Sequence, residues 1–159
     1  MHSFYKIFIL LMISGSMALA QGKKEIKKNN IRSTTITDME GGKNLNNKKS
    51  VYDKNGETIE ETDYDKDGNL KTIKKYKFNK DGDVEEEEEY DAKTKETEKR
   101  SYKYNSLAEK VEEDISDGSG KKIRTHYYTY NSRGLKIQKK TVDANGKTLC
   151  IRTYAYEYK

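Results

Sequence analysis

The amino-acid sequence predicts an all-β fold: a repetitive antiparallel β-hairpin meander of about ten strands in a single curved or twisted sheet. Three observations lead to this prediction. The chain repeats itself every 26 residues, turn signals recur every 12 to 14 residues, and aromatic residues two positions apart return once per repeat. Turn signals at this spacing separate short strands, so each repeat is expected to form one β-hairpin and its link to the next.

The aromatic residues form the clearest column of the repeat. Copies of the 26-residue repeat begin at Asp38, Tyr64, Tyr90, Ser116 and Val142. The aromatic pairs are Tyr76 with Phe78, Tyr102 with Tyr104, Tyr128 with Tyr130, and Tyr154 with Tyr156. A spacing of two places both rings of a pair on one face of a strand, whereas on a helix they would diverge by about 200°. The column either packs within the sheet or forms a binding surface for a carbohydrate or a peptide.

The turns between the strands have a recognisable chemistry. Asp or Asn stands first and Gly fourth in Asp53–Gly56, Asn79–Gly82, Asn131–Gly134 and Asp143–Gly146. This pattern is typical of a type I turn whose Asx side chain caps backbone amides and whose glycine takes a left-handed conformation. Thr94 and Ala108 replace glycine in the third copy, so those two turns are expected to be longer, looser or differently shaped.

Strands are expected between the turns, near residues 31–37, 43–52, 57–64, 69–78, 83–90, 95–104, 109–116, 121–130, 135–142 and 147–156. Lys43, Lys48 and Lys49 are expected to protect the first edge of the sheet against uncontrolled strand pairing.

The N-terminus predicts export. Residues 1–20 combine an early Lys6 with a short apolar run and an Ala-x-Ala ending, which is typical of a signal peptide cleaved before Gln21. Residues 21–30 are expected to form a basic flexible tail, and residues 31–159 the repeat domain. The mature protein is then expected to be secreted or periplasmic, with association with the cell surface as a further option, and to have no transmembrane segment.

Composition narrows the function classes. Charged residues make up 37% of the chain, yet the net charge is only +5 because Lys and Glu are interspersed, which argues against a nucleic-acid partner. A single cysteine, Cys150, excludes an intrachain disulfide. No cofactor motif is present, and large aliphatic residues are too sparse to fill an ordinary two-layer core.

One turn raises the question of calcium. Asp63, Asp65, Asp67 and Gly68 match the first half of an EF-hand loop, but Lys74 stands where the last carboxylate ligand belongs. The flanking segments also have the pattern of strands. A repeat turn is therefore favoured, with a weak calcium site at Asp63, Asp65 and Asp67 as the alternative.

Two further sets of residues have side chains suited to binding or catalysis. The run Glu85–Glu89 is expected to form cross-strand ion pairs with lysines such as Lys71, Lys74 and Lys75, with a site for a cation or a basic partner as the alternative. His126 and Cys150 would be the base and nucleophile of a catalytic dyad, but no orienting group or oxyanion site has a signature. His126 is expected on the surface and Cys150 in packing, and the protein is not expected to be an enzyme.

The segments Tyr52–Gly56 and Tyr64–Leu70, each followed by a strand and, in the second case, an aromatic pair, resemble the YD repeats of the RHS family and related hairpin repeats of small exported bacterial proteins. The resemblance covers about residues 38–158. It implies a curved or spiralling sheet of hairpins and a bacterial, surface-related setting. The chain is too short to build the shell of the large family members, and no catalytic residue is carried over.

These observations together predict a non-catalytic binding or structural module of the bacterial cell envelope, with a protein or carbohydrate ligand. An accessory or immunity-type partner of a secreted system is one alternative. A small hydrolase using His126 and Cys150 is another.

Overall fold

The structure is a computed structural model that describes residues 22–158. The predicted signal peptide and its cleavage site at Gln21 lie outside the described residues. The elements in chain order are α1 (Gly22–Lys28), β1 (Ser33–Glu40), β2 (Lys43–Tyr52), β3 (Thr58–Tyr64), β4 (Leu70–Phe78), β5 (Val84–Asp91), β6 (Glu96–Tyr104), β7 (Lys110–Asp117), β8 (Lys122–Tyr130), β9 (Lys136–Asp143) and β10 (Thr148–Thr153).

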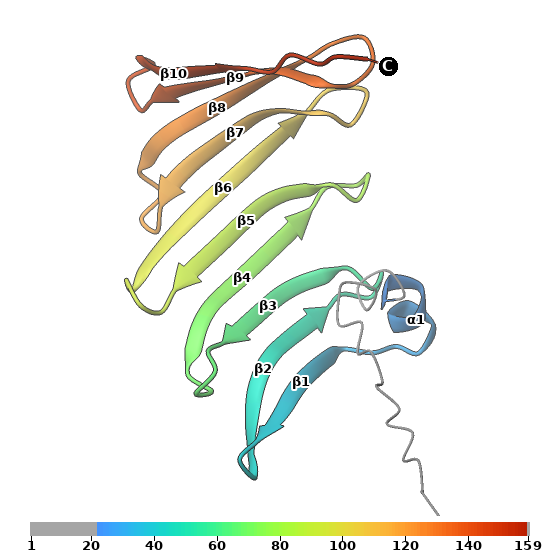
Figure 1. The fold of residues 1–159 in the computed structure, drawn as a ribbon. Helices are drawn as coiled ribbons and strands as arrows, with labels where there is room; N and C mark the ends of the chain where they lie inside the picture. Colours follow the sequence, from blue (N-terminus) through green and yellow to red (C-terminus); the bar gives the residue numbers. More distant parts are fainter. Residues whose placement is uncertain (1–21, 159) are drawn as a thin grey trace, which may run out of the picture.

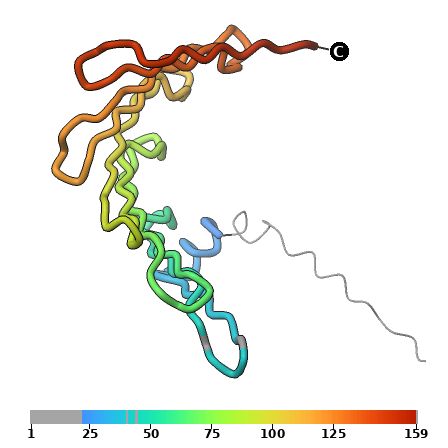
Figure 2. The backbone as a smooth tube through the Cα atoms, turned by 60° about the vertical axis from the view of Figure 1, so that its left-hand side comes forward, coloured from blue at the N-terminus to red at the C-terminus, as the bar shows by residue number. Residues whose placement is uncertain are grey.

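All ten strands belong to one antiparallel sheet, and their order in the sheet is their order in the chain. This confirms the predicted all-β meander. Figure 1 shows the hairpins stacked one beside the next from β1 to β10, and Figure 2 shows the sheet bowed into a crescent. The strands form a single layer, and α1 lies only against the N-terminal end of the sheet.

Most strand boundaries lie within a residue or two of those predicted, with exceptions at the two ends of the sheet. β1 continues to Glu40, because Gly41 and Gly42 both take positive φ angles, 57° and 77°, and close a two-residue hairpin turn. β10 ends at Thr153, before the last aromatic pair. β10 has a neighbour on only one side, so it lacks the second ladder of hydrogen bonds that extends the inner strands.

The turns have the predicted chemistry. In the β3–β4 turn, Oδ1 of Asp65 accepts hydrogen bonds from the amides of Asp67 and Asn69, each at 2.9 Å, and Gly68 has a φ of 80°. The same pattern of an Asx cap and a left-handed glycine recurs at Asp53, Asn79, Asp117, Asn131 and Asp143. These turns set how each strand pairs with the next.

The third repeat copy gives a mixed outcome. The expectation of a differently shaped turn is wrong at Ala108, which takes a left-handed φ of 59° inside the standard pattern, with Oδ1 of Asn105 accepting from the amides of Leu107 and Glu109. These cap bonds and the strand pairing on both sides outweigh the strain of a left-handed alanine. The expectation is confirmed at Thr94, because that turn is one residue longer and closes from the amide of Lys95 to the carbonyl of Asp91.

The N-terminal segment differs from the expected flexible tail, because residues 22–28 form α1. Ile26 is buried, and Lys23 forms an ion pair with Glu57. The helix packs closely on the β2–β3 turn, where a Cβ added to Gly56 would lie 2.6 Å from the carbonyl oxygen of Lys23. A single apolar residue gives no helical periodicity, so the sequence pattern carried no signal for this helix.

The expected edge protection is also wrong in its placement. Lys43, Lys48 and Lys49 lie on β2, an inner strand, and Lys48 forms an ion pair with Glu61 at 2.9 Å. The edge strand is β1, which contains no lysine. In the described part of the chain, no helix has the length and apolar character needed to cross a membrane.

Replacing Ala108 by Gly is expected to stabilise the protein by up to about 1 kcal/mol, because an alanine in the left-handed region costs about 1–2 kcal/mol and glycine does not bear that cost. Urea denaturation followed by circular dichroism measures the change.

The matched control is Gly146→Ala in the β9–β10 turn, where φ is 84° and an added Cβ would have no atom within 4 Å. This control is expected to lose a similar amount of stability. A destabilised Ala108→Gly variant would contradict the proposed origin of the strain.

Candidate functional site

The aromatic column lies on one face of the sheet, named here the tyrosine face. It is defined by Tyr76, Tyr102 and Tyr128 and by the residues opposite them on neighbouring strands. Tyr76 pairs with Glu87, Tyr102 with Glu113, and Tyr128 with Lys139. Opposite residues of this kind have Cβ atoms about 5 Å apart on one face, so the side chains of each pair can interact within β4–β5, β6–β7 and β8–β9.

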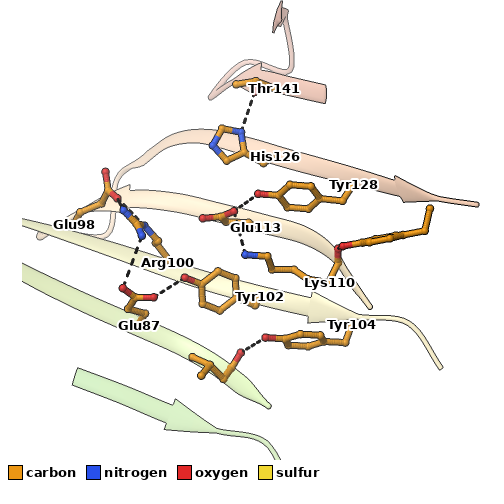
Figure 3. A network of polar contacts seen from close by, with 12 residues as sticks. Glu87, Glu98, Arg100, Tyr102, Tyr104, Lys110, Glu113, His126, Tyr128 and Thr141 are labelled. Carbon is orange, nitrogen blue, oxygen red and sulfur yellow. Dashed lines mark hydrogen bonds and ion pairs between the residues drawn. The ribbon is translucent and has the colours of Figure 1, made fainter. Parts of the chain in front are cut away.

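The tyrosine hydroxyls link strands that are neighbours in the sheet (Figure 3). In two of the pairs the first tyrosine donates to a glutamate on the preceding strand: Tyr102 to Glu87 at 2.7 Å, and Tyr128 to Glu113. The second tyrosine donates to a backbone carbonyl twenty residues earlier. These bonds run from Tyr104 to Val84, Tyr130 to Lys110 and Tyr156 to Lys136.

The acceptor glutamates were missed by sequence reasoning. The signal was present, because Glu61, Glu87 and Glu113 recur at the same 26-residue step as the tyrosines.

The predicted binding-surface residues are for the most part packed. Tyr128 is only 8% exposed, Tyr156 is 41% exposed, and the others are half-buried: Tyr76, Phe78, Tyr102, Tyr104, Tyr130 and Tyr154. Lysines lie over the central rings, with Nζ of Lys110 at 4.5 Å from the ring centre of Tyr102 and Nζ of Lys136 at 4.4 Å from that of Tyr128. The geometry favours the packing interpretation, since these rings are not open for a flat ligand to stack upon.

Glu113 is the most enclosed carboxylate of the tyrosine face. Its burial raises its pKa, but the hydrogen bond from Tyr128 and the ammonium of Lys110 at 3.5 Å outweigh burial and hold the pKa below its ordinary value. Burial and the contact with Glu113 raise the pKa of Tyr128. The pair is therefore a carboxylate held by a neutral phenol at neutral pH.

His126 and Cys150 are found in the opposite environments to those expected. His126 is buried at 8% exposure, with Nδ1 at 3.0 Å from Oγ1 of Thr141, whereas Cys150 is exposed. Thr141 pairs with His126 on one side and with Cys150 on the other, so β9 lies between them. Two strand spacings amount to about 10 Å, and no contact joins the two side chains into a dyad.

The acidic run on β5 is compensated by its neighbours. Glu89 pairs with Lys74 at 3.3 Å, Glu88 with Lys99 at 3.7 Å, and Glu87 with Arg100 at 3.8 Å. The expected ion pairs are confirmed for Lys74. Partners also come from β6, which sequence reasoning did not name.

The calcium candidates do not converge. Asp65 uses its carboxylate to cap its own turn, and Oδ2 of Asp63 accepts a hydrogen bond from Thr72 at 3.2 Å on the adjacent strand. Among the described residues, no three His, Cys, Asp or Glu side chains gather around a common point suited to a metal ion.

The charge pattern of the tyrosine face changes at its C-terminal end. The repeat position held by Glu61, Glu87 and Glu113 becomes Lys139 on β9, and Lys139 stands directly opposite Arg152 on β10. From Lys122 to Tyr158 the only acidic residues are Asp143 and Glu157. We name Lys136, Lys139 and Arg152 the C-terminal basic surface. None of the three forms an ion pair within the described residues, unlike Lys122 and Arg124 on β8.

Phe78 occupies the position of Tyr104 and Tyr130 but has no hydroxyl. Because those tyrosines donate to the first residue of a strand twenty positions earlier, Phe78→Tyr is expected to donate to the carbonyl of Thr58 and to stabilise the protein by about 1 kcal/mol. Chemical denaturation measures the gain. Tyr104→Phe is the matched control and should lose a similar amount; a neutral Phe78→Tyr would show that the column is not equivalent at this position.

Acid is expected to destabilise the fold through His126 and Glu113. Burial lowers the pKa of His126, with Lys139 lowering it further, so the unfolded chain binds the proton more tightly and stability falls as the pH drops below about 6.5. The lowered pKa of Glu113 acts in the same direction from about pH 4.5 downward. Denaturation between pH 8 and pH 4 measures the loss, and His126→Gln should flatten its upper part. An imidazole midpoint above 6.5 by NMR would contradict this account.

Comparisons with known proteins give no functional assignment. No family model matches the chain, and no curated protein matches it. Among solved structures, a protein of unknown function from Bacteroides fragilis matches over 74% of this chain and 96% of that chain, with 18% sequence identity and a TM-score of 0.19. At that identity and TM-score, the likeness carries no conclusion about fold or function.

Proposed function

We propose that the protein is an exported, non-catalytic binding module of the bacterial cell envelope, and that its ligand is an acidic polysaccharide held by the C-terminal basic surface. The observation that carries the proposal is the pair Lys139 and Arg152, two cations directly opposite each other with no carboxylate between them. Like charges in this arrangement destabilise a sheet, and a bound anion would offset that cost.

The contrast with the rest of the sheet strengthens the argument. Where the repeat has Glu87 and Glu113, each carboxylate is matched by a tyrosine hydroxyl and a cation within reach. At the equivalent position Lys139 has neither an acidic partner nor a phenol donor. The C-terminal end of this repetitive face therefore differs in charge from the part that contains Glu87 and Glu113.

The shape of the molecule suits an extended ligand. The basic surface lies on a single-layer sheet that no other element covers at its C-terminal end (Figure 1), so a polymer can run across the strands without entering a closed pocket. The predicted leader and the resemblance to YD repeats support an envelope setting. The separation of His126 from Cys150 by Thr141 gives no support to the hydrolase alternative.

The test is the affinity of the purified protein for alginate, an acidic polysaccharide, measured by isothermal titration calorimetry against neutral dextran. Lys139→Glu restores the residue that the repeat has in its earlier copies and reverses the charge of the basic surface. It is expected to weaken alginate binding about tenfold, a difference of about 1.4 kcal/mol.

The matched control is Lys93→Glu in the exposed β5–β6 turn, which changes the net charge equally and should retain the affinity. Equal losses in both variants, or equal binding of alginate and dextran, would contradict a ligand site at the basic surface.

A further inference from the structure

The two outermost strands of the sheet each leave one edge open. β1 pairs only with β2 and β10 only with β9, so within the described residues nothing pairs with the outer backbone of either strand. Figure 1 places α1 near the β2–β3 turn, away from the outer side of β1. Open edges are templates for pairing with another strand, and natural proteins commonly block them with lysine or proline.

Neither edge strand carries that protection. β1 has the sequence STTITDME, with acidic residues and no basic one, and β10 has the sequence TLCIRT, with one arginine and no acidic residue. A bulge at Leu149 interrupts the start of β10, but Cys150–Thr153 pair regularly with β9. The two open edges thus lack lysine and proline, and they are opposite in charge.

The backbone groups that point outward can be assigned from the inner ladders. On β10 the amide of Tyr154 bonds inward to Ile137, so by alternation Ile151 and Thr153 present their N–H and C=O groups outward. On β1 the carbonyl of Arg32 accepts inward from Tyr52, and the same alternation turns Thr37 and Met39 outward. Outward residues must face outward residues when two such edges pair.

We propose that β10 of one copy pairs antiparallel with β1 of a second copy, with Ile151 opposite Met39 and Arg152 opposite Asp38. This register matches the outward backbone groups of both strands and places Thr153 opposite Thr37. It joins two exposed apolar side chains, Ile151 at 55% and Met39 at 77% exposure. It also joins an arginine to an aspartate on the tyrosine face.

The alternation of the sheet identifies a second copy as the partner. In the repeat, each strand that carries an aromatic pair, such as β8, is followed by a return strand such as β9. β10, which precedes the last aromatic pair, is the final strand of the sheet, and β1 is a return strand. β1 of a second copy, placed beside β10, therefore supplies the return strand that the alternation requires there. A two-fold pairing of β10 with itself that sets Ile151 opposite Thr153 would instead place Arg152 opposite Arg152, which like-charge repulsion disfavours.

Pairing of this kind is head to tail, so each added copy exposes a new β10 edge and growth continues unless the curvature closes a ring. The contact is only a few residues long, far below a standard protein interface, so association is expected to be concentration-dependent.

Sedimentation velocity over a hundredfold range of protein concentration tests the assembly. The average mass is expected to rise with concentration, and both Arg152→Asp and Asp38→Arg should shift that rise to at least tenfold higher concentration. The double variant D38R/R152D, which exchanges the two charges, should restore it. A monomer at every concentration, or a double variant as weak as the single ones, would overturn the proposal.

Disulfide trapping tests the register. In a Cys150→Ala background, a chain with Met39→Cys mixed with a chain carrying Ile151→Cys should form a mixed disulfide-linked dimer under mild oxidation. The same Ile151→Cys chain mixed with a Thr35→Cys chain, which presents an outward residue in a different register, should give several-fold less. Equal yields from the two mixtures, or a dimer of the Ile151→Cys chain alone in preference to the mixed product, would overturn the register proposed.

Discussion

The register between neighbouring strands is the constraint on which the rest of this structure depends. A slip of one residue would turn every side chain of a strand to the other face, moving Tyr102 away from Glu87 and Lys74 away from Glu89. The capped turns hold the register, because Asp65 and its equivalents fix where each strand begins relative to the one before. The tyrosine column, the ion pairs and the position of His126 all follow from that alignment.

A sheet of one layer has no interior of the usual kind, and the structure shows what replaces it. Among the residues that the structure describes, only a few, such as Ile115 and Thr125, are fully enclosed. Rings laid across adjacent strands bury apolar area while their hydroxyls bond to Glu87, Glu113 or a carbonyl, and the ammonium groups of lysines such as Lys110 lie over the rings. The high content of charged residues is therefore compatible with a folded protein, since many of them are paired across strands.

The fold could be predicted from the sequence to the level of single turns, because the repeat supplies several independent copies of each signal. Departure from the glycine column correctly predicted a different turn at Thr94 but not at Ala108. Ala108 keeps the turn of its glycine equivalents because Asn105 and the flanking strands hold it there. α1 depends on the close approach of Lys23 to Gly56. No pattern in residues 22–28 predicts this contact.

The candidate site was only partly predictable for a related reason. The tyrosines form an evident column, but their acceptors Glu87 and Glu113 lie 15 residues earlier on two different strands, and Glu87 is read first as part of the charged run on β5. The environments of His126 and Cys150 depend on distance from the sheet edge. The distance of a residue from the edge depends on how many strands of the folded sheet lie beyond it, and its neighbours in the sequence do not reveal this.

The agreement between strand order and chain order has a kinetic consequence. Every strand pairs only with the strand before it and the strand after it, so contacts join residues close in sequence and the contact order is low. Each new hairpin can add to hairpins that are already folded. Unfolding can likewise begin at one end of the sheet while the central hairpins stay folded. A chain of this kind can fold progressively, one hairpin at a time, without first bringing its two ends together.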